Sequence, residues 1–432
     1  MAKSMWTNPP IACPDCGTKQ ELPPLPPSGV AFCVRCDRVL DRGAAWGLSA
    51  GIAVSLATLA LLLAANTLPL MRAYLQGIPR DTRLPAAVAA VWREGWPWFA
   101  VMVAAFVIVL PIARALAIGG VLLAVKCNWR PRWLGRVFRY AENVRYWAMP
   151  EVAALALFII FMRSVAQLEA EVGAGGWCLL AASVLSLGTP WLVGSQQIWQ
   201  AILPDRPEPE HEPGGDSAGS CEACHMILPD SLLGSQCPRC LKRVVIRKTG
   251  SMNRTAALVV AGYILYGPSY YFAMSYTIRP DGVEQHTIFT GIERLFEEGF
   301  GYLGVILFLS SVCIPFVKLV GLTWLLLRVR QPSARGLVLR TRVHRIIYRI
   351  GRWSNTGPFV VALNVPLYSF VGMADVHVGR AALPFALVVA LTMLASQSFD
   401  PRLMWDAQEG TEEGAEEGDS EGARKGARED AS

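Results

Sequence analysis

Eight stretches of this chain are almost continuously apolar over the length that a helix needs to cross a bilayer. Roughly 20 apolar residues cross the hydrocarbon layer of about 30 Å. The stretch that begins near residue 149 is the weakest, because Glu151 and Arg163 interrupt it. The pattern predicts an all-α polytopic membrane protein with helices at 46–66, 96–125, 149–168, 177–199, 255–275, 300–328, 356–375 and 380–399.

A polar segment with paired cysteines precedes the first four apolar stretches, and a second one precedes the last four. Each segment contains two Cys-x-x-Cys motifs, which are separated by 16 residues in the first segment and by 12 in the second. Four thiolates from two such motifs close a tetrahedral Zn²⁺ site that has no open coordination position. The spacing predicts two zinc ribbons, each with one structural zinc ion, held by Cys13, Cys16, Cys33 and Cys36 and by Cys221, Cys224, Cys237 and Cys240.

Two other interpretations of these motifs are weaker. A redox-active Cys-x-x-Cys does not come as two matched pairs in each half of a chain. His225 directly follows Cys224, and we interpret it as a solvated loop residue rather than as a zinc ligand. Because thiolates are available to a metal only where they stay reduced, both ribbons are expected in a reducing compartment.

The two halves of the chain superpose with an offset of about 204–208 residues, which indicates a tandem duplication. The landmarks include Cys13 on Cys221, Glu94 on Glu298, Pro111 on Pro315 and Trp199 on Trp405. Parallel repeats place a shared site at or near the interface between them. The predicted units are a ribbon (1–43), a four-helix repeat (44–203), a linker (204–219), a second ribbon (220–250), a second four-helix repeat (251–405) and a disordered acidic tail (406–432).

Composition agrees with a membrane protein and excludes an ordinary soluble one. The chain has 432 residues, of which 53% are hydrophobic and 17% charged, and its mean hydropathy is +0.35. It contains no phosphate-binding loop and no dinucleotide-binding fingerprint. No grouping of Ser, His, Asp or Cys suggests a catalytic centre on a water-facing scaffold. We therefore expect neither an enzyme, nor an ATPase, nor a partner of nucleic acid.

The charges of the loops predict the orientation of the helices. The loops at 126–145 and 330–352 are rich in arginine, whereas the loop at 276–299 is acidic. Because basic loops stay on the cytosolic side of a membrane, both ribbons, the linker and both termini are predicted to be cytosolic. Residues 1–43 are polar and show no cleavable signal peptide, so the first apolar helix is expected to remain as an anchor.

Lys318 lies about midway along the predicted helix at 300–328. A lysine at this depth costs about 2.5–3.5 kcal/mol on insertion scales, so it is expected to face the interior of the bundle beside a counter-charge or hydroxyl groups. Candidate partners in the sequence are Glu151, Ser310, Ser311 and Thr392. Two interpretations stay open: an ion pair that only orients helices, and a site whose charge state changes during transport.

Four segments of the chain resemble the paraquat-inducible protein A family, together with the order of a ribbon and four apolar stretches. They are AANTLPLM (64–71), TIFTGIERLFEEG (287–299), IYRIGRWS (347–354) and ALTMLASQSFDPRLMWD (390–406). The resemblance covers nearly everything except the linker and the tail. It implies tetraspanin-like four-helix bundles and an inner-membrane component of a lipid transport system in a double-membraned bacterium. The usual partner in this family is a periplasm-spanning MCE-domain protein that forms a hydrophobic tunnel.

The resemblance also implies a polar centre, made of Lys318, Ser311, Thr392 and Glu151. Asn355 stands near the position where the second half of the family usually carries an aspartate. The function it implies is movement of membrane phospholipid between the inner membrane and the MCE-type partner, without an ATPase of its own. Two alternatives remain: a membrane scaffold or assembly factor for that partner, and an ion-coupled exporter of a hydrophobic small molecule.

Overall fold

The computed structural model describes residues 10–23, 25–43, 47–75, 78–167, 169–192, 194–203, 219–279, 282–329, 331, 336–368 and 375–407. Most of the predicted linker (204–218) and most of the predicted acidic tail (408–432) lie outside the described residues. The statements that follow concern the described residues.

The first half is built from helices and one small sheet. Its long second helix is continuous from Pro97 to Lys126 and contains a π-helical stretch just before Pro111. Proline has no N–H to donate and its ring displaces the preceding turn, which favours such a local widening. The elements are α1 (Leu48–Thr67), β5 (Met71–Leu75), β6 (Ile78–Thr82), α2 (Leu84–Arg93), α3 (Pro97–Val103), η1 (Ala104–Val109), α4 (Leu110–Lys126), α5 (Leu134–Val144), α6 (Pro150–Gln167), β7 (Glu169–Val172), α7 (Ala174–Leu192) and α8 (Ser195–Ile202).

The second half follows nearly the same order of elements, including a π-helical stretch before Pro315. Thr287 caps α10, because its Oγ1 accepts from the Thr290 N–H at 3.2 Å. The elements are α9 (Ser251–Tyr271), β10 (Ser275–Arg279), β11 (Gly282–His286), α10 (Ile288–Glu297), α11 (Gly301–Phe308), η3 (Leu309–Cys313), α12 (Ile314–Arg328), α13 (Leu337–Ile350), η4 (Gly351–Asn355), α14 (Thr356–Tyr368), β12 (Asp375–Val378) and α15 (Ala382–Ser398).

The fold is mostly helical, but the prediction of an all-α chain is wrong in one respect. Each half contains an antiparallel three-stranded sheet, with strand orders β6-β5-β7 and β11-β10-β12. These strands are only four or five residues long and lie in the loops between apolar helices. The ribbons add short hairpins, made of β1 (Ile11–Ala12), β2 (Lys19–Gln20), β3 (Val30–Phe32), β4 (Val39–Arg42), β8 (Gly219–Ser220) and β9 (Ile227–Leu228).

Three helices among the described residues are long and apolar enough to cross a membrane: Leu48–Thr67, Pro97–Lys126 and Gly301–Arg328. The bent pair α7 and α8 makes a fourth if it counts as one span. Helices also form over the other four predicted stretches, but their described residues do not meet the same test of length and composition. The chain is therefore a membrane protein, and the number of eight spans stays a prediction.

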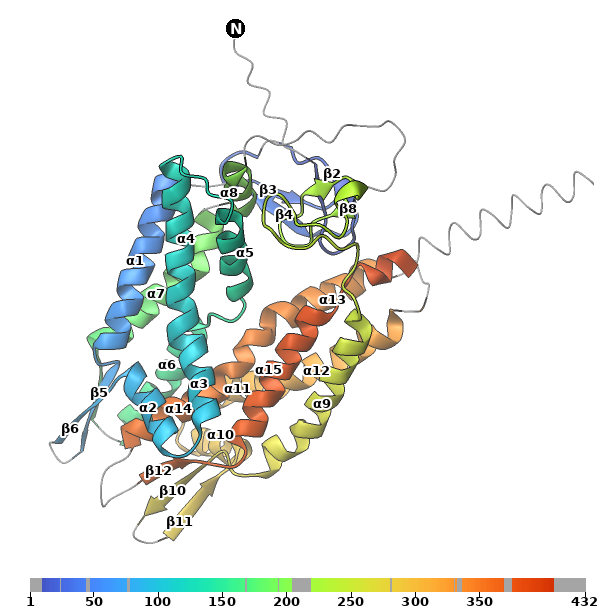
Figure 1. Ribbon diagram of the computed structural model, residues 1–432. Coiled ribbons are helices and arrows are strands. Elements are labelled where there is room, and N and C mark those ends of the chain that lie inside the picture. The colour runs from blue at the N-terminus through green and yellow to red at the C-terminus, as the bar shows by residue number, and fades with distance from the viewer. Residues whose placement is uncertain are drawn as a thin grey trace, which may run out of the picture.

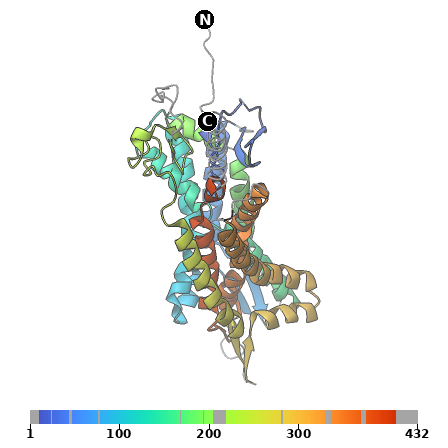
Figure 2. The same ribbon diagram turned by 90° about the vertical axis from the view of Figure 1, so that its right-hand side faces the viewer.

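The helices of the two halves lie side by side, with the ribbons at one end and both three-stranded sheets at the other (Figures 1 and 2). The basic helices α5 and α13 lie at the ribbon end. The halves meet where α14 packs against α2 and α6. A single hydrophobic core spans this contact and includes Phe99 and Met149 from the first half and Phe359 and Phe385 from the second. Close packing of these large side chains holds the halves together, because the association of helices in a bilayer rests on van der Waals contact.

Candidate functional site

Each Cys-x-x-Cys motif folds as a tight turn that aims its two thiols at one point. The N–H of the residue four positions after the first cysteine donates to that cysteine's carbonyl, at 2.8–3.0 Å in all four turns. The donor has a left-handed backbone in every case, although only one of the four is glycine: Gly17, Asp37, His225 and Leu241. The regularity shows that all four turns share the geometry of a metal knuckle.

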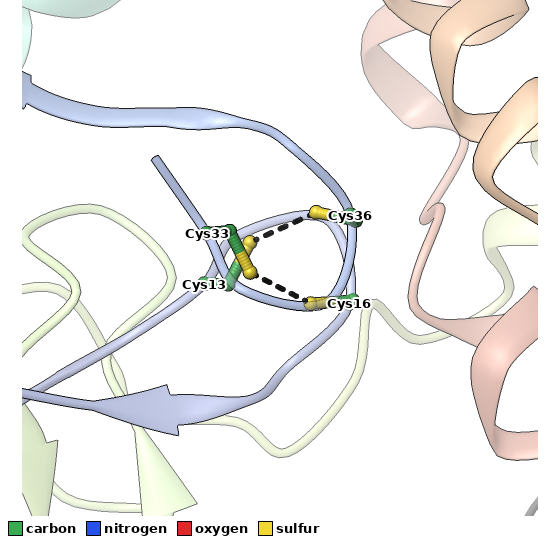
Figure 3. A group of neighbouring side chains, drawn as sticks. All are labelled: Cys13, Cys16, Cys33 and Cys36. Carbon is green, nitrogen blue, oxygen red and sulfur yellow. Dashed lines mark hydrogen bonds between the residues drawn. The ribbon is translucent and has the colours of Figure 1, made fainter. Parts of the chain in front are cut away.

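The turns bring the predicted cysteines together in two buried clusters, and within each the sulfur atoms lie within 4.8 Å of one another. Figure 3 shows the first cluster, in which Cys13 Sγ lies 3.5 Å from Cys36 Sγ and Cys16 Sγ lies 3.5 Å from Cys33 Sγ. The corresponding distances in the second cluster are 3.4 and 3.7 Å. Tetrahedral Zn–S bonds of about 2.3 Å place ligand sulfurs about 3.8 Å apart. Both clusters therefore fit a zinc ion.

His225 is not the solvated residue that its position in a loop suggested. Its side chain is partly buried, and its carbonyl accepts from the Ala12 N–H at 3.3 Å. Burial lowers the pKa of the imidazole to about 4, so the ring is neutral at physiological pH. The four-cysteine group of the second ribbon does not include it. His225 is a packing residue where the two ribbons meet.

Lys318 is fully buried in α12, as the sequence predicts. Among the described residues, its ammonium has one hydrogen-bond acceptor, the Gly351 carbonyl oxygen, at 3.5 Å. Gly351 begins η4, the short turn that follows α13. An ammonium with a single distant acceptor is poorly compensated for the loss of water. The charge of Lys318 is therefore only weakly compensated.

The predicted counter-charge, Glu151, pairs with a different residue. Its Oε1 lies 2.6 Å from Arg352 Nη1, and both side chains are largely buried. Glu151 belongs to α6 of the first half and Arg352 to η4 of the second half. The structure therefore places the acid beside the residue that follows Gly351, and the ion pair ties the two halves together.

The predicted hydroxyl groups of Thr392 and Ser311 do not bond to the lysine. Thr392 Oγ1 donates to the Val389 carbonyl of its own helix at 3.0 Å. Ser311 Oγ is buried and has no hydrogen-bond partner. A Cβ added at Gly357 would lie 2.9 Å from this Ser311 oxygen. Three of the four predicted residues, Lys318, Glu151 and Ser311, thus adjoin the segment 351–357, and the four do not form one hydrogen-bonded network.

Asn355 occupies the centre of this segment and is fully buried. Its Nδ2 faces the sulfur of Met149 at 3.2 Å and that of Met393 at 3.5 Å, and its Oδ1 has no hydrogen-bond partner. Two thioethers would not stabilise a carboxylate. The Arg352 carbonyl also accepts from this Nδ2, at 3.4 Å, so the surroundings of Asn355 suit an amide N–H rather than a carboxylate.

Sequence reasoning missed Gly351, Arg352 and Tyr146 as members of the site. Tyr146 stacks on Tyr348 of the other half with ring centres 4.4 Å apart, and its hydroxyl lies 3.2 Å from Ser396 Oγ. The run Gly351-Arg352-Trp353-Ser354 was the sequence signal for Gly351 and Arg352, but the prediction placed the polar centre on the membrane helices. The turn between the basic helix α13 and α14 supplies the contacts instead.

A cavity of about 160 Å³ lies next to the polar centre, between the first half and the second. Its walls are mostly apolar, and Ser311 and Gly357 line it. Arg163 lies 3.9 Å from Glu298, and Arg294 pairs with Glu284. The other lining residues include Ile159, Ile160, Thr277, His286, Ile288, Gly291, Leu295, Leu307, Val360, Val361 and Asn364. The cavity thus joins an apolar space to two arginines and to the polar centre.

Known proteins are similar in sequence to nearly the whole chain. The family model described as Paraquat-inducible protein A matches residues 48–203 and 252–409. The chain is 28% identical to "Intermembrane transport protein PqiA" of Escherichia coli (strain K12), over 93% of this chain and 97% of that protein. It is 26% identical to "Lipophilic envelope-spanning tunnel protein A" of the same strain, over 92% of this chain and 91% of that protein. No solved structure matches the chain.

The two clusters predict the metal content of the protein. We expect two zinc ions per purified chain, and one after Cys33→Ser, because a ribbon cannot close a tetrahedral site with three thiolates and stay stable. Elemental analysis against protein concentration measures the ratio. Cys127→Ser is the control, because Cys127 is exposed and outside both clusters. A well-folded wild-type protein with one zinc or none would contradict the expectation.

Proposed function

Because this chain belongs to the paraquat-inducible protein A family, we propose that it is the inner-membrane component of an intermembrane lipid transport system. It moves phospholipid between the inner membrane and a periplasm-spanning partner of the MCE type, and it has no ATPase of its own. The relatives named intermembrane transport protein and lipophilic envelope-spanning tunnel protein support the transport role. The chemistry of the cavity supports a lipid as the cargo.

The cavity between α6, α10 and α14 is the observation that carries this proposal. An apolar cavity of about 150 Å³ holds a molecule of the size of benzene, so a cavity of about 160 Å³ admits a segment of a lipid and not a whole one. Its aliphatic walls suit an acyl chain. Arg163 and Arg294, which pair with Glu298 and Glu284, would offer their remaining N–H donors to a phosphate. A lipid held here keeps the rest of its length in the bilayer.

The polar centre is the second part of the proposal, because Ser311 belongs to it and also lines the cavity. Lys318 has one acceptor at 3.5 Å, so any movement of Gly351 changes how well its charge is compensated. Its protonation or pairing then changes as lipid enters or leaves the adjoining cavity. Glu151 acts through Arg352 rather than by contact with the lysine.

The proposed topology keeps the ribbons cytosolic, with two tetraspanin-like repeats of four spans and the domain division given above. Exposed tryptophans support a membrane band between the two ends of the molecule. Trp129 and Trp133 are exposed between α4 and α5, near the ribbons, and Trp92 and Trp98 are exposed near the sheets. Tryptophan side chains gather at the two interfaces of a bilayer.

Labelling of single cysteines tests this topology. In a background with Cys127, Cys178 and Cys313 changed to serine, Val283→Cys on β11 and Leu339→Cys on α13 place a thiol at sites that are 62% and 60% exposed. A membrane-impermeant maleimide is expected to label the first in intact cells and the second only after permeabilisation. Labelling in the opposite sense would overturn the proposed orientation.

Filling the cavity tests the cargo site. A Cβ at Gly291 meets no atom within 4 Å, and Gly291 lines the cavity, so Gly291→Phe is expected to occupy it without displacing the backbone. Cross-linking to a phospholipid with a photoreactive acyl chain is then expected to fall by about tenfold, a loss of about 1.4 kcal/mol of binding.

Gly267→Phe is the matched control for this change. Gly267 also meets no atom within 4 Å but lies on α9, away from the cavity. Its cross-linking is expected to equal that of the wild type. Equal cross-linking in Gly291→Phe and Gly267→Phe would show that lipid does not use this cavity.

Replacement of Lys318 tests the polar centre. Lys318→Ala is expected to abolish complementation of a deletion strain under detergent or chelator stress, while expression and zinc content stay near normal. Lys318→Arg is expected to rescue poorly, because arginine keeps the charge but does not release its proton. Lys126→Ala is the control, since that lysine is exposed at the end of α4. Full complementation by Lys318→Ala would favour a scaffold over a transporter.

A further inference from the structure

Each four-cysteine ribbon packs against the opposite half of the chain. The first cluster shares a hydrophobic core with Leu337, Phe399 and Trp405 of the second half. The second cluster shares a core with Leu134, Phe138 and Trp199 of the first half. The arrangement is crossed, because each cysteine cluster covers the basic helix of the opposite half. Each ribbon also keeps a contact with its own half, since Arg42 lies 3.8 Å over the Trp191 ring and Arg247 pairs with Asp406.

The first ribbon contacts α13 through two arginines, an exposed one, Arg342, and a largely buried one, Arg345. Arg345 Nε donates to Asp15 Oδ2 at 2.5 Å, and its Nη2 donates to the Cys36 carbonyl oxygen at 2.8 Å. The same Nη2 lies 3.1 Å from Cys36 Sγ, a sulfur of the cluster. The side chains of Arg345 and Asp15 are 15% and 3% exposed. A guanidinium thus binds the outer shell of the metal site.

The second ribbon contacts α5 in an equivalent way. Arg139 Nη1 donates to the Cys240 carbonyl oxygen at 2.9 Å. A Cβ at Gly135, one turn earlier on α5, would overlap the Arg239 carbonyl oxygen, so only glycine allows this approach. Arg139 and Arg345 are 206 positions apart, within the repeat offset. Each therefore binds the last cysteine of the ribbon that belongs to the other half.

Helix α13 connects the first ribbon to the polar centre within two turns. Arg345 contacts the ribbon at one side of the helix, and Tyr348 stacks on Tyr146 of the first half. The next residues begin η4, where the Gly351 carbonyl accepts from Lys318 and Arg352 pairs with Glu151. A displacement of α13 at Arg345 would move the only described acceptor of the buried lysine.

We propose that the metal-loaded ribbons are crossed clamps, each of which holds the basic helix of the opposite half. In the first ribbon, Arg345 is the positioning residue that links metal occupancy to the polar centre. Without metal, four buried thiols have no common ligand and the knuckles lose their order, so Arg345 loses its acceptors. This inference rests on the proposed metal binding and does not depend on lipid transport.

Hydrogen exchange of the full-length, zinc-loaded protein tests the crossing. Cys33→Ser empties the first site without changing an atom that Arg345 contacts. Exchange is then expected to rise at least about tenfold in 337–355, with 134–144 unchanged, because charged hydrogen bonds are lost there. Cys237→Ser is expected to give the converse, with faster exchange in 134–144. Faster exchange in the basic helix of the half that follows the emptied ribbon in sequence, or only within the ribbons, would overturn the proposal.

A second pair of variants tests the role of Arg345 with both metals bound. Arg345→Gln is expected to keep two zinc ions per chain and to speed exchange in 337–355. Arg342→Gln is the matched control on the same helix, because its ion pair with Asp37 is more than half exposed on both sides. If amide hydrogens in 337–355 exchange at the same rate in the two variants while both hold two zinc ions, Arg345 is not a positioning residue. A zinc count below two in the wild type would instead refute the metal binding itself.

Discussion

The polar centre and the cavity both depend on one contact, the packing of α14 against α2 and α6. It brings α6 of the first half next to α10 and α14 of the second, and the cavity forms between them. It also brings Glu151 of α6 within reach of Arg352 in the turn before α14. A change that separated α14 from the first half would remove the cavity wall and the ion pair together.

The two halves arose by duplication, but their equivalent buried cations have different partners. Arg114 and Lys318 are equivalent in the two halves and both are buried, but Arg114 reaches Ser186 on α7 at 3.3 Å while Lys318 reaches the Gly351 carbonyl. The longer, forked guanidinium finds a partner on a neighbouring helix, and the shorter ammonium depends on a backbone turn. The buried cation of the first half therefore bonds to a helix, and that of the second half bonds to a connecting turn. The cavity lies beside the polar centre to which this second cation belongs.

Local chemistry was predictable from the sequence, whereas contacts between distant segments were not. Cysteine spacing predicted both clusters, and the cost of a buried charge predicted that Lys318 faces inward. The prediction that Glu151 is the counter-charge of Lys318 was wrong, because Glu151 pairs with Arg352. Arg352 follows an arginine-rich helix and was counted among the loop charges. The short strands were missed because strands of four or five residues give little periodicity. Nothing in the sequence order indicates that each ribbon covers the opposite half.

The crossed ribbons and the α14 core hold the halves at opposite ends of the molecule (Figure 1). If the halves are held at both ends, a lipid that uses the proposed site would enter it through local rearrangement near the cavity. The turn at 351–357 is suited to this, because it carries two glycines, a 3₁₀ segment and Asn355, whose Oδ1 has no hydrogen-bond partner, and it lies beside the unpartnered Ser311 hydroxyl of η3. A buried charge with one acceptor beside such a turn would respond to a small shift of the backbone, and no large motion of the helices would be required.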